Sequence, residues 1–412
     1  MSYTELNLDL SEDHFALKEA VHKFSIEVLR PASIELDRMS AKEVIAPGSL
    51  YWKTMKKMYE LNYHTVLISD AYGGLGLDPL ANHIFWEELA YGSVGFAVSL
   101  GCSTFSPFYA TMLAEDSLIE KYVIPFVECR DAGVMSCWGI TEPDHGSDNL
   151  MPRTSFFRDS RITQQVKARK KNGDWVINGQ KSAWISNGPV ADNISLFVNM
   201  DPGMGMSGGG ICLMELGSDG ISKGPPLDKM GQRELPQGEV FFDNVVVPGD
   251  QMIIDPESYE MMTELTLAHA NAVMGAYFTG VAQSAYDLAL QYTTERVQGG
   301  RKLCEHQWVQ KKLSEMFIKV STARSFSRDA MYYNMNITPP DAKYSIASKV
   351  YCTQAAFEIT SDAVQLFGGY GLSRELPVEK LFRDARAGMI EDGSNDSLSI
   401  TIGSMLAGEV LE

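Results

Sequence analysis

The sequence lacks the short motifs that mark the commonest nucleotide-binding and hydrolytic sites. No G-x-x-x-x-G-K-[ST] is present, and the G-x-G-x-x-G and G-x-S-x-G patterns occur only within the glycine-rich stretch 203–209, where no helical segment follows to complete a phosphate-binding loop or a nucleophile elbow. The seven histidines do not fall at metal-ligand spacing, so no metal site is predicted. These absences argue against the simplest phosphate-binding loops, the commonest hydrolase elbow and a metalloenzyme.

Paired cysteines, excess positive charge and long apolar runs are also missing. The six cysteines are scattered without a C-x-x-C pair, which in a chain of 412 residues favours a reduced, intracellular protein. The formal net charge of -18 argues against nucleic acid and anionic membranes as partners. No apolar run approaches the roughly 20 residues of a membrane span, and the acidic N-terminus has no apolar signal core. We therefore expect a cytoplasmic protein without a membrane span.

The apolar pattern changes twice along the chain, which predicts three domains. Helical spacing dominates the first part, where Ser11 is a plausible N-cap. Short segments rich in Val, Ile, Phe and Trp then alternate with Asn-Gly and other glycine turns, as in an antiparallel sheet of hairpins. Four amphipathic stretches follow, the last two joined by a charged link. We expect an α+β multidomain fold with an N-terminal helical domain (1–133), a middle antiparallel β-domain (134–253) and a C-terminal four-helix bundle (254–412).

Two stretches offer groups that suit a polar ring, although each has a plainer interpretation. WGITEPDHGSDN contains the hydroxyls of Thr141 and Ser147, yet it also reads as an ordinary Pro-Asp turn. AWISNG places Trp184 and Ser186 on the same face of a strand, yet a tryptophan on a strand is commonly a core residue. A flavin needs donors such as these, because its reduced form holds negative charge on its carbonyl side.

The stretch GMIEDGSND places Glu391 and Asp392 directly before a Gly-Ser turn. Acidic residues are favoured in the first turn of a helix, so a solvated pair opening the next helix is the plain interpretation. The alternative is that one of the two takes a proton from a substrate.

Five stretches spread over nearly the whole chain occur together in one order: TEPDHGSD, INGQKSAWISNG, KMGQRELPQGEVFFDNVVVP, TERVQGGRKLCEHQ and VQLFGGYGLSRELPVEKLFRDAR. In this register they resemble the acyl-CoA dehydrogenase family. The resemblance implies a helical, then β, then helical fold, usually in a homotetramer, with FAD bound between the domains and partly by a neighbouring subunit. It implies α,β-dehydrogenation of a CoA thioester, with electrons usually passed to an electron-transferring flavoprotein.

The resemblance also implies roles for individual residues of this sequence. The positions matching the flavin pocket are Trp138, Ile140, Thr141 and Ser147, with Trp184 and Ser186 on the other side of the ring. The positions matching contacts to the adenine dinucleotide part are Arg296, Gln298, His306 and Gln307, with Gln365 to Gly369, including Gly368, from the neighbouring chain. Ser394 and Asp396 match positions after the catalytic turn.

The family's catalytic turn, usually I-Y-E-G-T, is altered here. Asp392 falls on the usual glutamate base and Glu391 on the usual tyrosine, while the family's alternative base position, on the first helix of the C-terminal bundle, holds Ala270 and Asn271. An aspartate is one methylene shorter, and a misplacement of about 1 Å can cost roughly a hundredfold in rate. Three explanations stay open: a closer or bulkier substrate, a takeover by Glu391, or proton removal elsewhere or not at all. Geometry favours Asp392 as the base, with Glu391 as a rim or auxiliary acid.

The substrate contacts implied by the resemblance also depart from the family pattern. Ala268 and Asn271 replace the usual Asp and Arg, with His269 between them, and Gly299 replaces a Phe near the cofactor. The leading hypothesis is an FAD-dependent acyl-CoA dehydrogenase with an atypical, alicyclic or branched acyl-CoA substrate. The alternatives are a flavin oxidase of small carbon acids, similar to nitroalkane oxidase, and a non-catalytic assembly protein. The expected substrate contacts are Ser147, His269, Asn271 and Gly393.

Overall fold

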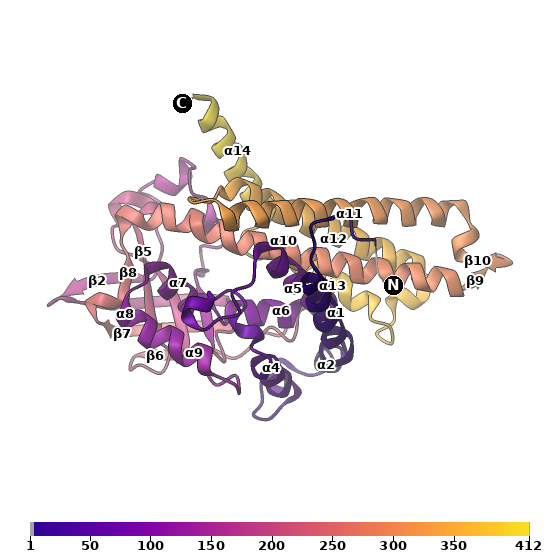
Figure 1. Cartoon of the computed structure of the whole chain (residues 1–412). Coiled ribbons are helices and arrows are strands. Elements are labelled where there is room, and N and C mark those ends of the chain that lie inside the picture. The colour runs from indigo at the N-terminus through magenta and orange to yellow at the C-terminus, as the bar shows by residue number, and fades with distance from the viewer. Residues whose placement is uncertain (1–3, 412) are drawn as a thin grey trace.

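The N-terminal region of the protein is helical. The computed structural model describes residues 4–411. Ser11 caps the first helix, as predicted, because its hydroxyl accepts a hydrogen bond from the backbone N–H of His14 at 3.3 Å. The helices are α1 (Glu12–Phe24), α2 (Arg30–Leu36), α3 (Ala41–Val44), α4 (Leu50–Glu60), α5 (Pro79–Gly92), α6 (Val94–Cys102), α7 (Phe105–Leu113), α8 (Asp116–Leu118) and α9 (Ile124–Glu128) (Figure 1).

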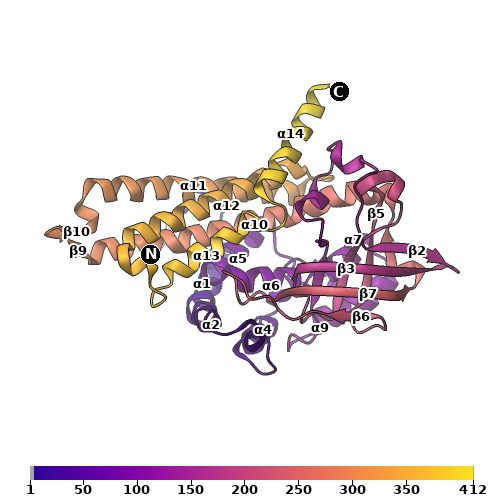
Figure 2. The same ribbon diagram turned by 180° about the vertical axis from the view of Figure 1, so that it is seen from behind.

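The middle region is a single sheet of strand order β6-β7-β3-β2-β4-β5-β8, with β1 paired to β4 (Figure 2). The β2–β3 hairpin turns at Asn172 and Gly173, whose φ angles of 56° and 97° belong to the Asn-Gly turn type that favours hairpins. Most pairings are antiparallel, as expected, but β4 runs parallel to β1 and β2 because no tight hairpin joins those pairs. The strands are β1 (Ser136–Gly139), β2 (Lys167–Lys171), β3 (Asp174–Ser186), β4 (Asn193–Asn199), β5 (Gly209–Glu215), β6 (Ile221–Lys223), β7 (Gln237–Val247) and β8 (Met252–Ile254).

Alternate residues of the central strands face two different cores. On β4, Phe197 packs in the core shared with the helices, whereas its neighbours Leu196 and Val198 pack in a second core within the sheet domain. On β1, Trp138 packs in the core shared with the helices, and its neighbour Cys137 packs in the core within the sheet domain. One face of the sheet, including Trp138, is therefore turned toward the helical regions.

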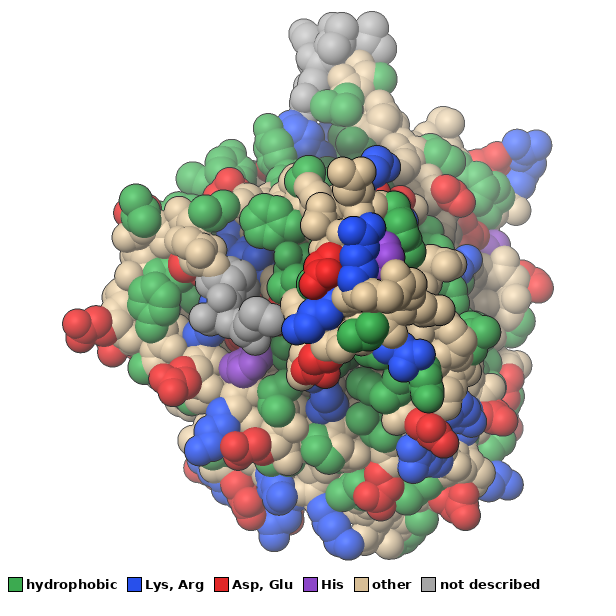
Figure 3. All heavy atoms as spheres, turned by 90° about the vertical axis from the view of Figure 1, so that its right-hand side faces the viewer, with side chains coloured by type: hydrophobic (Ala, Val, Ile, Leu, Met, Phe, Trp, Pro, Cys, Tyr) green, Lys and Arg blue, Asp and Glu red, His purple; other side chains and the backbone are tan. Residues whose placement is uncertain are grey.

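Long helices form the C-terminal region, with a short hairpin at one end. Figures 1 and 2 show α10, α11 and α12 lying along one another, with the sheet domain at one end and the β9–β10 hairpin at the other. Figure 3 looks onto the hairpin end, where basic, acidic and apolar side chains are mixed. The elements are α10 (Pro256–Glu295), β9 (Val297–Gln298), β10 (Arg301–Lys302), α11 (Gln307–Asn336), α12 (Ala342–Phe367), α13 (Val378–Gly388) and α14 (Asn395–Leu411).

Helix α13 occupies the stretch that was expected to be only a link. Val378, Leu381 and Ala385 fall at i, i+3 and i+7, and all three are buried. Pro377 stands directly before the helix, where its missing N–H breaks no helical hydrogen bond. This extra helix fixes the start of the acidic turn.

The predicted domain boundaries after residues 133 and 253 stay predictions.

Candidate active site

The acidic turn lies between α13 and α14 and has an unusual backbone. Asp392 has a φ of 50° and Gly393 a φ of 94°, so two successive residues lie in the left-handed region. Glycine adopts this region freely, and aspartate tolerates it better than most residues. Helix α14 begins at Asn395 and has Asp396, not Glu391 or Asp392, in its first turn. The plain interpretation of the acidic pair as a first helical turn is therefore wrong.

Side chains from distant parts of the sequence hold this turn in place. A left-handed conformation at a residue other than glycine persists only where surrounding contacts over-determine it. The turn is therefore a product of tertiary structure. The contacts are Asn271 Nδ2 to the Asp392 carbonyl at 3.4 Å, Lys349 Nζ to the Gly393 carbonyl at 2.6 Å, and the Ser394 N–H to the Ser147 hydroxyl at 2.8 Å.

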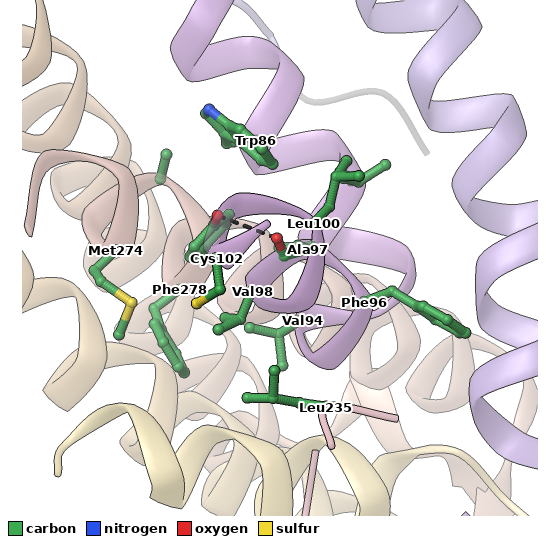
Figure 4. Close-up of a cluster of buried hydrophobic side chains, with 14 of the residues drawn as sticks. Trp86, Val94, Phe96, Ala97, Val98, Leu100, Cys102, Leu235, Met274 and Phe278 are labelled. Carbon is green, nitrogen blue, oxygen red and sulfur yellow. Dashed lines mark hydrogen bonds between the residues drawn. The ribbon is translucent and has the colours of Figure 1, made fainter. Parts of the chain in front are cut away.

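Two cavities meet at the side chain of Asp392. The first, of about 710 Å³, lies against the sheet domain, and the second, of about 580 Å³, lies among α6, α7 and α10. Val98, Cys102 and Asp392 line both cavities, whereas Glu391 lines only the first. Figure 4 shows the side chains of Val98 and Cys102 on α6 near those of Phe278 and Met274 on α10. Of the two acids, Asp392 is the one that borders both cavities.

Loss of water raises the pKa of both carboxyl groups. Burial raises the pKa of Asp392 to about 6, and the charge of Lys349 opposes this rise. Burial raises the pKa of Glu391 to about 7, opposed by the charge of Lys229 and a hydrogen bond from Gln232. At neutral pH Asp392 is therefore mostly ionised, yet more basic than an exposed aspartate, as a general base requires.

Glu391 belongs to the wall of the first cavity. Gln232 Nε2 donates a hydrogen bond to Glu391 Oε2 at 3.1 Å. Lys229 lines the same cavity and donates to the Leu235 carbonyl at 2.8 Å and to Gln237 Oε1 at 2.7 Å. Burial lowers the pKa of Lys229 to about 8, and Glu391 opposes this shift. The side chain of Glu391 is thus tied to the sheet-domain loop and not to the second cavity.

The first cavity gathers the residues for which the resemblance implies flavin contacts. Trp184 and Ser186 both line it from β3, and the Trp184 side chain is 56% exposed, so the core interpretation of this tryptophan is wrong. Arg386 also lines the cavity, and its buried Nη1 has no hydrogen-bond partner within residues 4–411. A ligand that brings acceptors would satisfy it. The predicted flavin residues in the lining are Trp138, Ile140, Thr141, Ser147, Trp184 and Ser186.

A third cavity, of about 760 Å³, lies at the hairpin end and gathers most of the predicted adenine-side residues. Gly368 has a φ of 62°, and a Cβ on Gly368 or Gly369 would meet no atom within 4 Å, so the backbone here faces open space. Gln307 lies instead in a neighbouring hollow that shares His306 and Trp308. The predicted residues that line the third cavity are Arg296, Gln298, His306, Gln365, Gly368 and Gly369.

The first and third cavities border α10 at different places: Met274, near the middle of the helix, lines the first, and Tyr292, near its C-terminal end, lines the third. The 18-residue step from Met274 to Tyr292 spans about 27 Å at roughly 1.5 Å per residue. Because Arg296 and Gln365 line the same hollow, a ligand that reached one would also reach the other in the same chain. Both groups lie together in one chain, and the expectation that Gln365 to Gly369 reach the cofactor of a neighbouring chain stays a prediction.

The predicted substrate contacts are divided by the structure. His269 lines the second cavity with Asp392, packs against Phe108 at 5.3 Å between ring centroids, and its Nδ1 donates to the Leu265 carbonyl at 2.8 Å. Asn271 is fully buried beneath the turn and is absent from the lining of both cavities. Ser147 and Gly393 line the first cavity. Asp396 is exposed, and neither it nor Ser394 lines these cavities.

Sequence reasoning missed several residues that surround the turn. Three of them are Lys229, Gln232 and Cys102. Nothing in the sequence around these residues indicated that they lie beside the acidic turn. Lys349 did leave a signal, because it falls on the apolar stripe of α12 with Ile346 and Ala356, at i-3 and i+7. A lysine on the buried face of a helix is unusual.

In the described part of the chain, no three His, Cys, Asp or Glu residues are placed to hold a metal ion, and no helix is long and apolar enough to cross a membrane.

Sequence models of one family match most of the chain. The acyl-CoA dehydrogenase N-terminal domain matches residues 11–128, the middle domain residues 137–245, and the C-terminal domain residues 260–406. The chain therefore belongs to the acyl-CoA dehydrogenase family, whose members are flavoprotein oxidoreductases with FAD as the typical cofactor and a homotetramer as the typical assembly.

Individual relatives agree with this assignment over nearly their whole length. The chain is 29% identical to a probable acyl-CoA dehydrogenase, FadE25, of Mycobacterium tuberculosis, over 94% of this chain and 93% of that one. It resembles the structure of butyryl-CoA dehydrogenase from Megasphaera elsdenii, with 26% identity, a TM-score of 0.85, and coverage of 98% and 100%. It also resembles a glutaryl-CoA dehydrogenase complexed with glutaryl-CoA, with 27% identity, a TM-score of 0.86, and coverage of 98% and 97%. The family, enzyme class and fold class inferred from the five motifs are confirmed.

Proposed function

We propose that this acyl-CoA dehydrogenase uses Asp392 to remove the α-proton of an atypical, alicyclic or branched acyl-CoA. One observation supports this assignment most strongly: Asp392 borders both cavities, whereas Glu391 borders only the first. A base must reach the substrate while the substrate reaches the hydride acceptor, so it belongs at such a junction. Glu391 then has the auxiliary role of a wall residue.

FAD is the proposed cofactor, with its ring in the first cavity. The volume of about 710 Å³ suits a ligand of this class. Thr141, Ser147 and Ser186 offer hydroxyl groups, Trp184 offers an exposed ring, and Arg386 offers an unpartnered donor. When bound, the flavin supplies the acceptor for the hydride that leaves the β-carbon. The separation of the first and third cavities supports a site shared between chains of a homotetramer.

In this proposal the protein's own part in the reaction is to remove the α-proton of the thioester, in a site with little water. Thioester conjugation acidifies the α-proton, and the raised pKa of Asp392, about 6, brings the carboxylate closer to the strength that this proton requires. Asp392 stays mostly ionised at neutral pH because Lys349 opposes the effect of burial. Once protonated, Asp392 lies beside Glu391, which offers a second carboxylate on the cofactor side.

The second cavity supports a compact acyl group. Its walls near Asp392 are mostly apolar and aromatic, with Phe105, Phe108 and Tyr277 among them. An aspartate reaches less far than the family's usual glutamate, so the α-carbon must lie closer to the backbone of the turn. A ring or branch that fills the cavity width would hold it there. Transfer of electrons to an electron-transferring flavoprotein and a cytoplasmic location stay proposals drawn from the family and the composition.

Anaerobic bleaching of the flavin by a panel of straight, branched and alicyclic acyl-CoAs tests this function. We expect the fastest bleaching with a branched or alicyclic thioester. Asp392→Asn should slow it by about 10²- to 10⁴-fold with FAD still bound, and the adjacent Glu391→Gln should retain far more activity. Bleaching that survives Asp392→Asn would remove Asp392 from the base role. Rapid peroxide formation without CoA would favour the oxidase alternative instead.

A further inference from the structure

Lys349 is a buried cation that reaches the acidic turn from behind. It lies on α12 with no exposed surface, and its Nζ donates to the Gly393 carbonyl at 2.6 Å and to Asn395 Oδ1 at 3.0 Å. It is absent from the lining of the first, second and third cavities. Lys349 therefore contacts the turn that bears Asp392 without being placed to touch substrate or cofactor.

The partners of Lys349 are neutral, which sets it apart from other buried lysines. Lys181 is paired with Glu142 at 2.7 Å, and Lys380 is paired with Asp384 at 2.6 Å. Among the described residues, no carboxylate lies within ion-pair distance of Lys349 Nζ. A buried ammonium group held only by a carbonyl and an amide lowers the free energy of unfolding, because these neutral partners do not replace its lost hydration. A neutral donor could bond to the same two oxygens with a smaller desolvation penalty, so the charge of Lys349 needs its own explanation.

The carboxylates that feel this charge are those of the acidic turn. The attraction of Asp392 and then of Glu391 opposes the effect of burial, which lowers the pKa of Lys349 to about 8. For Asp392, Lys349 is the cation that counters burial, while Glu391 is opposed first by Lys229. The two lysines thus approach the turn from different elements, and each acts mainly on one acid.

The other groups around Asp392 do not supply a compensating positive charge. From α6, Cys102 faces it as a neutral thiol, because burial raises the pKa of that thiol. From α10, Tyr277 faces it as a neutral phenol whose pKa is raised by burial, and Asn271 donates only a neutral amide bond. His269, across the second cavity, has its pKa lowered by burial and is neutral at pH 7.

We propose that Lys349 is a positioning residue of the reaction, which holds the backbone of the turn so that Asp392 points to the junction of the cavities and keeps Asp392 ionised at neutral pH. This role rests on the proposed function of Asp392 as the base. It predicts two separable effects. Loss of the hydrogen bonds should disturb the geometry of the turn, and loss of the charge should make Asp392 a weaker acid.

Substitutions of Lys349 in the full-length, FAD-loaded protein separate these effects. Lys349→Gln keeps a donor for the Gly393 carbonyl but removes the charge, and Lys349→Arg keeps the charge. Thr353→Val is the matched control from the same helix, because it removes the neutral contact of Thr353 with Asn395, at 3.0 Å, and leaves Lys349 intact. The rate of anaerobic flavin reduction is measured from pH 5.5 to 9 with the best acyl-CoA substrate.

In the wild type we expect the rate to rise with pH around a midpoint near 6, as Asp392 ionises. Lys349→Gln should move this midpoint upward by about one to two pH units, so that much of the lost rate returns at pH 9. Lys349→Arg and Thr353→Val should leave the midpoint in place even where they lower the plateau. An unchanged midpoint in Lys349→Gln would overturn the inference.

A second measurement does not depend on turnover. Infrared difference spectra report the C=O stretch of a protonated carboxylic acid, and its loss in Asp392→Asn assigns the band. In Lys349→Gln this band should persist to a higher pH than in the wild type; a band that titrates unchanged would overturn the role of the charge. The two proposals fail differently, because flavin reduction that survives in Asp392→Asn removes the base itself, whereas a stationary midpoint removes only Lys349.

Discussion

Two regions along α10, one on the side of the sheet and one at the hairpin, serve one proposed cofactor in physically different ways. At the sheet end, the acidic turn is half-buried, held by side chains from α10, α12 and the loop of Ser147, and adjacent carboxyl groups have raised pKa values. At the hairpin end, Arg296 and Gln298 are exposed and come from a short local motif. Contacts between residues far apart in the sequence build the first region, whereas residues close together in the sequence build the second.

This difference indicates which region determines reactivity and which determines cofactor affinity. Reactivity needs shifted protonation equilibria and an exact direction for one carboxylate, and both require desolvation and fixed neighbours. Binding of an extended cofactor at its far end needs mainly polar groups on a stable scaffold. Changes at the turn should therefore alter chemistry and stability, and changes at the hairpin should alter only cofactor affinity.

The largest effect expected in this comparison comes from lengthening the base. Asp392→Glu restores the residue usual in the family but moves the carboxylate by about one methylene toward the substrate. We expect the rate of flavin reduction with the native substrate to fall by about a hundredfold, while FAD affinity stays the same. Stopped-flow reduction and FAD titration measure the two quantities. A faster Asp392→Glu enzyme would show that the shorter acid is not matched to a closer or bulkier substrate.

The next effect is on stability and has a defined pH dependence. Burial raises the pKa of Glu391 from 4.5 in the unfolded chain to about 7 in the folded protein. The folded protein thus binds this proton more tightly, and stability falls as the pH rises from about 4.5 to 7. Glu391→Gln should remove a cost on the order of 2 kcal/mol at pH 8 and have little effect near pH 4.5.

Thermal unfolding of wild type and Glu391→Gln at both pH values measures this difference. The matched control is Glu315→Gln, because Glu315 is a partly exposed acid on α11 that pairs with Lys311, far from the turn. It should change stability little, and equally little at both pH values. Equal gains from the two variants, or a gain that does not depend on pH, would contradict a buried carboxyl group with a raised pKa at residue 391.

The same contrast explains what the sequence could and could not predict. Ser11 as a helix cap and the Asn172–Gly173 turn follow from local chemistry, and both predictions are confirmed. Register with family motifs also led to the groups that line the first and third cavities. Helix α13 was missed because Pro and charged pairs obscured its short apolar stripe. Lys349 was missed as a contact of the turn because residues 349 and 393 meet only through tertiary packing.

The smallest expected effect lies at the hairpin end. Gln298 is exposed on β9, and its backbone carbonyl accepts a hydrogen bond from His306 Nε2 at 2.9 Å. Gln298→Ala leaves this backbone contact and removes only the side chain. Loss of one neutral hydrogen bond to FAD is worth about 1 kcal/mol, or roughly a fivefold weaker affinity. Gln354→Ala, an exposed glutamine on α12 outside the cavity linings, is the control and should change nothing.

Mixed oligomers of Gln298→Ala chains and Asp392→Asn chains turn this small effect into a test of how the two regions combine. If the acidic turn of one chain works with the hairpin end of another, an intact turn on a Gln298→Ala chain can meet an intact Gln298 on its neighbour. Such hybrid sites should bind FAD with wild-type affinity and reduce it at the wild-type rate, although neither parent does both. If hybrids behave only as the average of the two parents, both regions act within one chain, and the separation of about 27 Å along α10 would have to be bridged in another way.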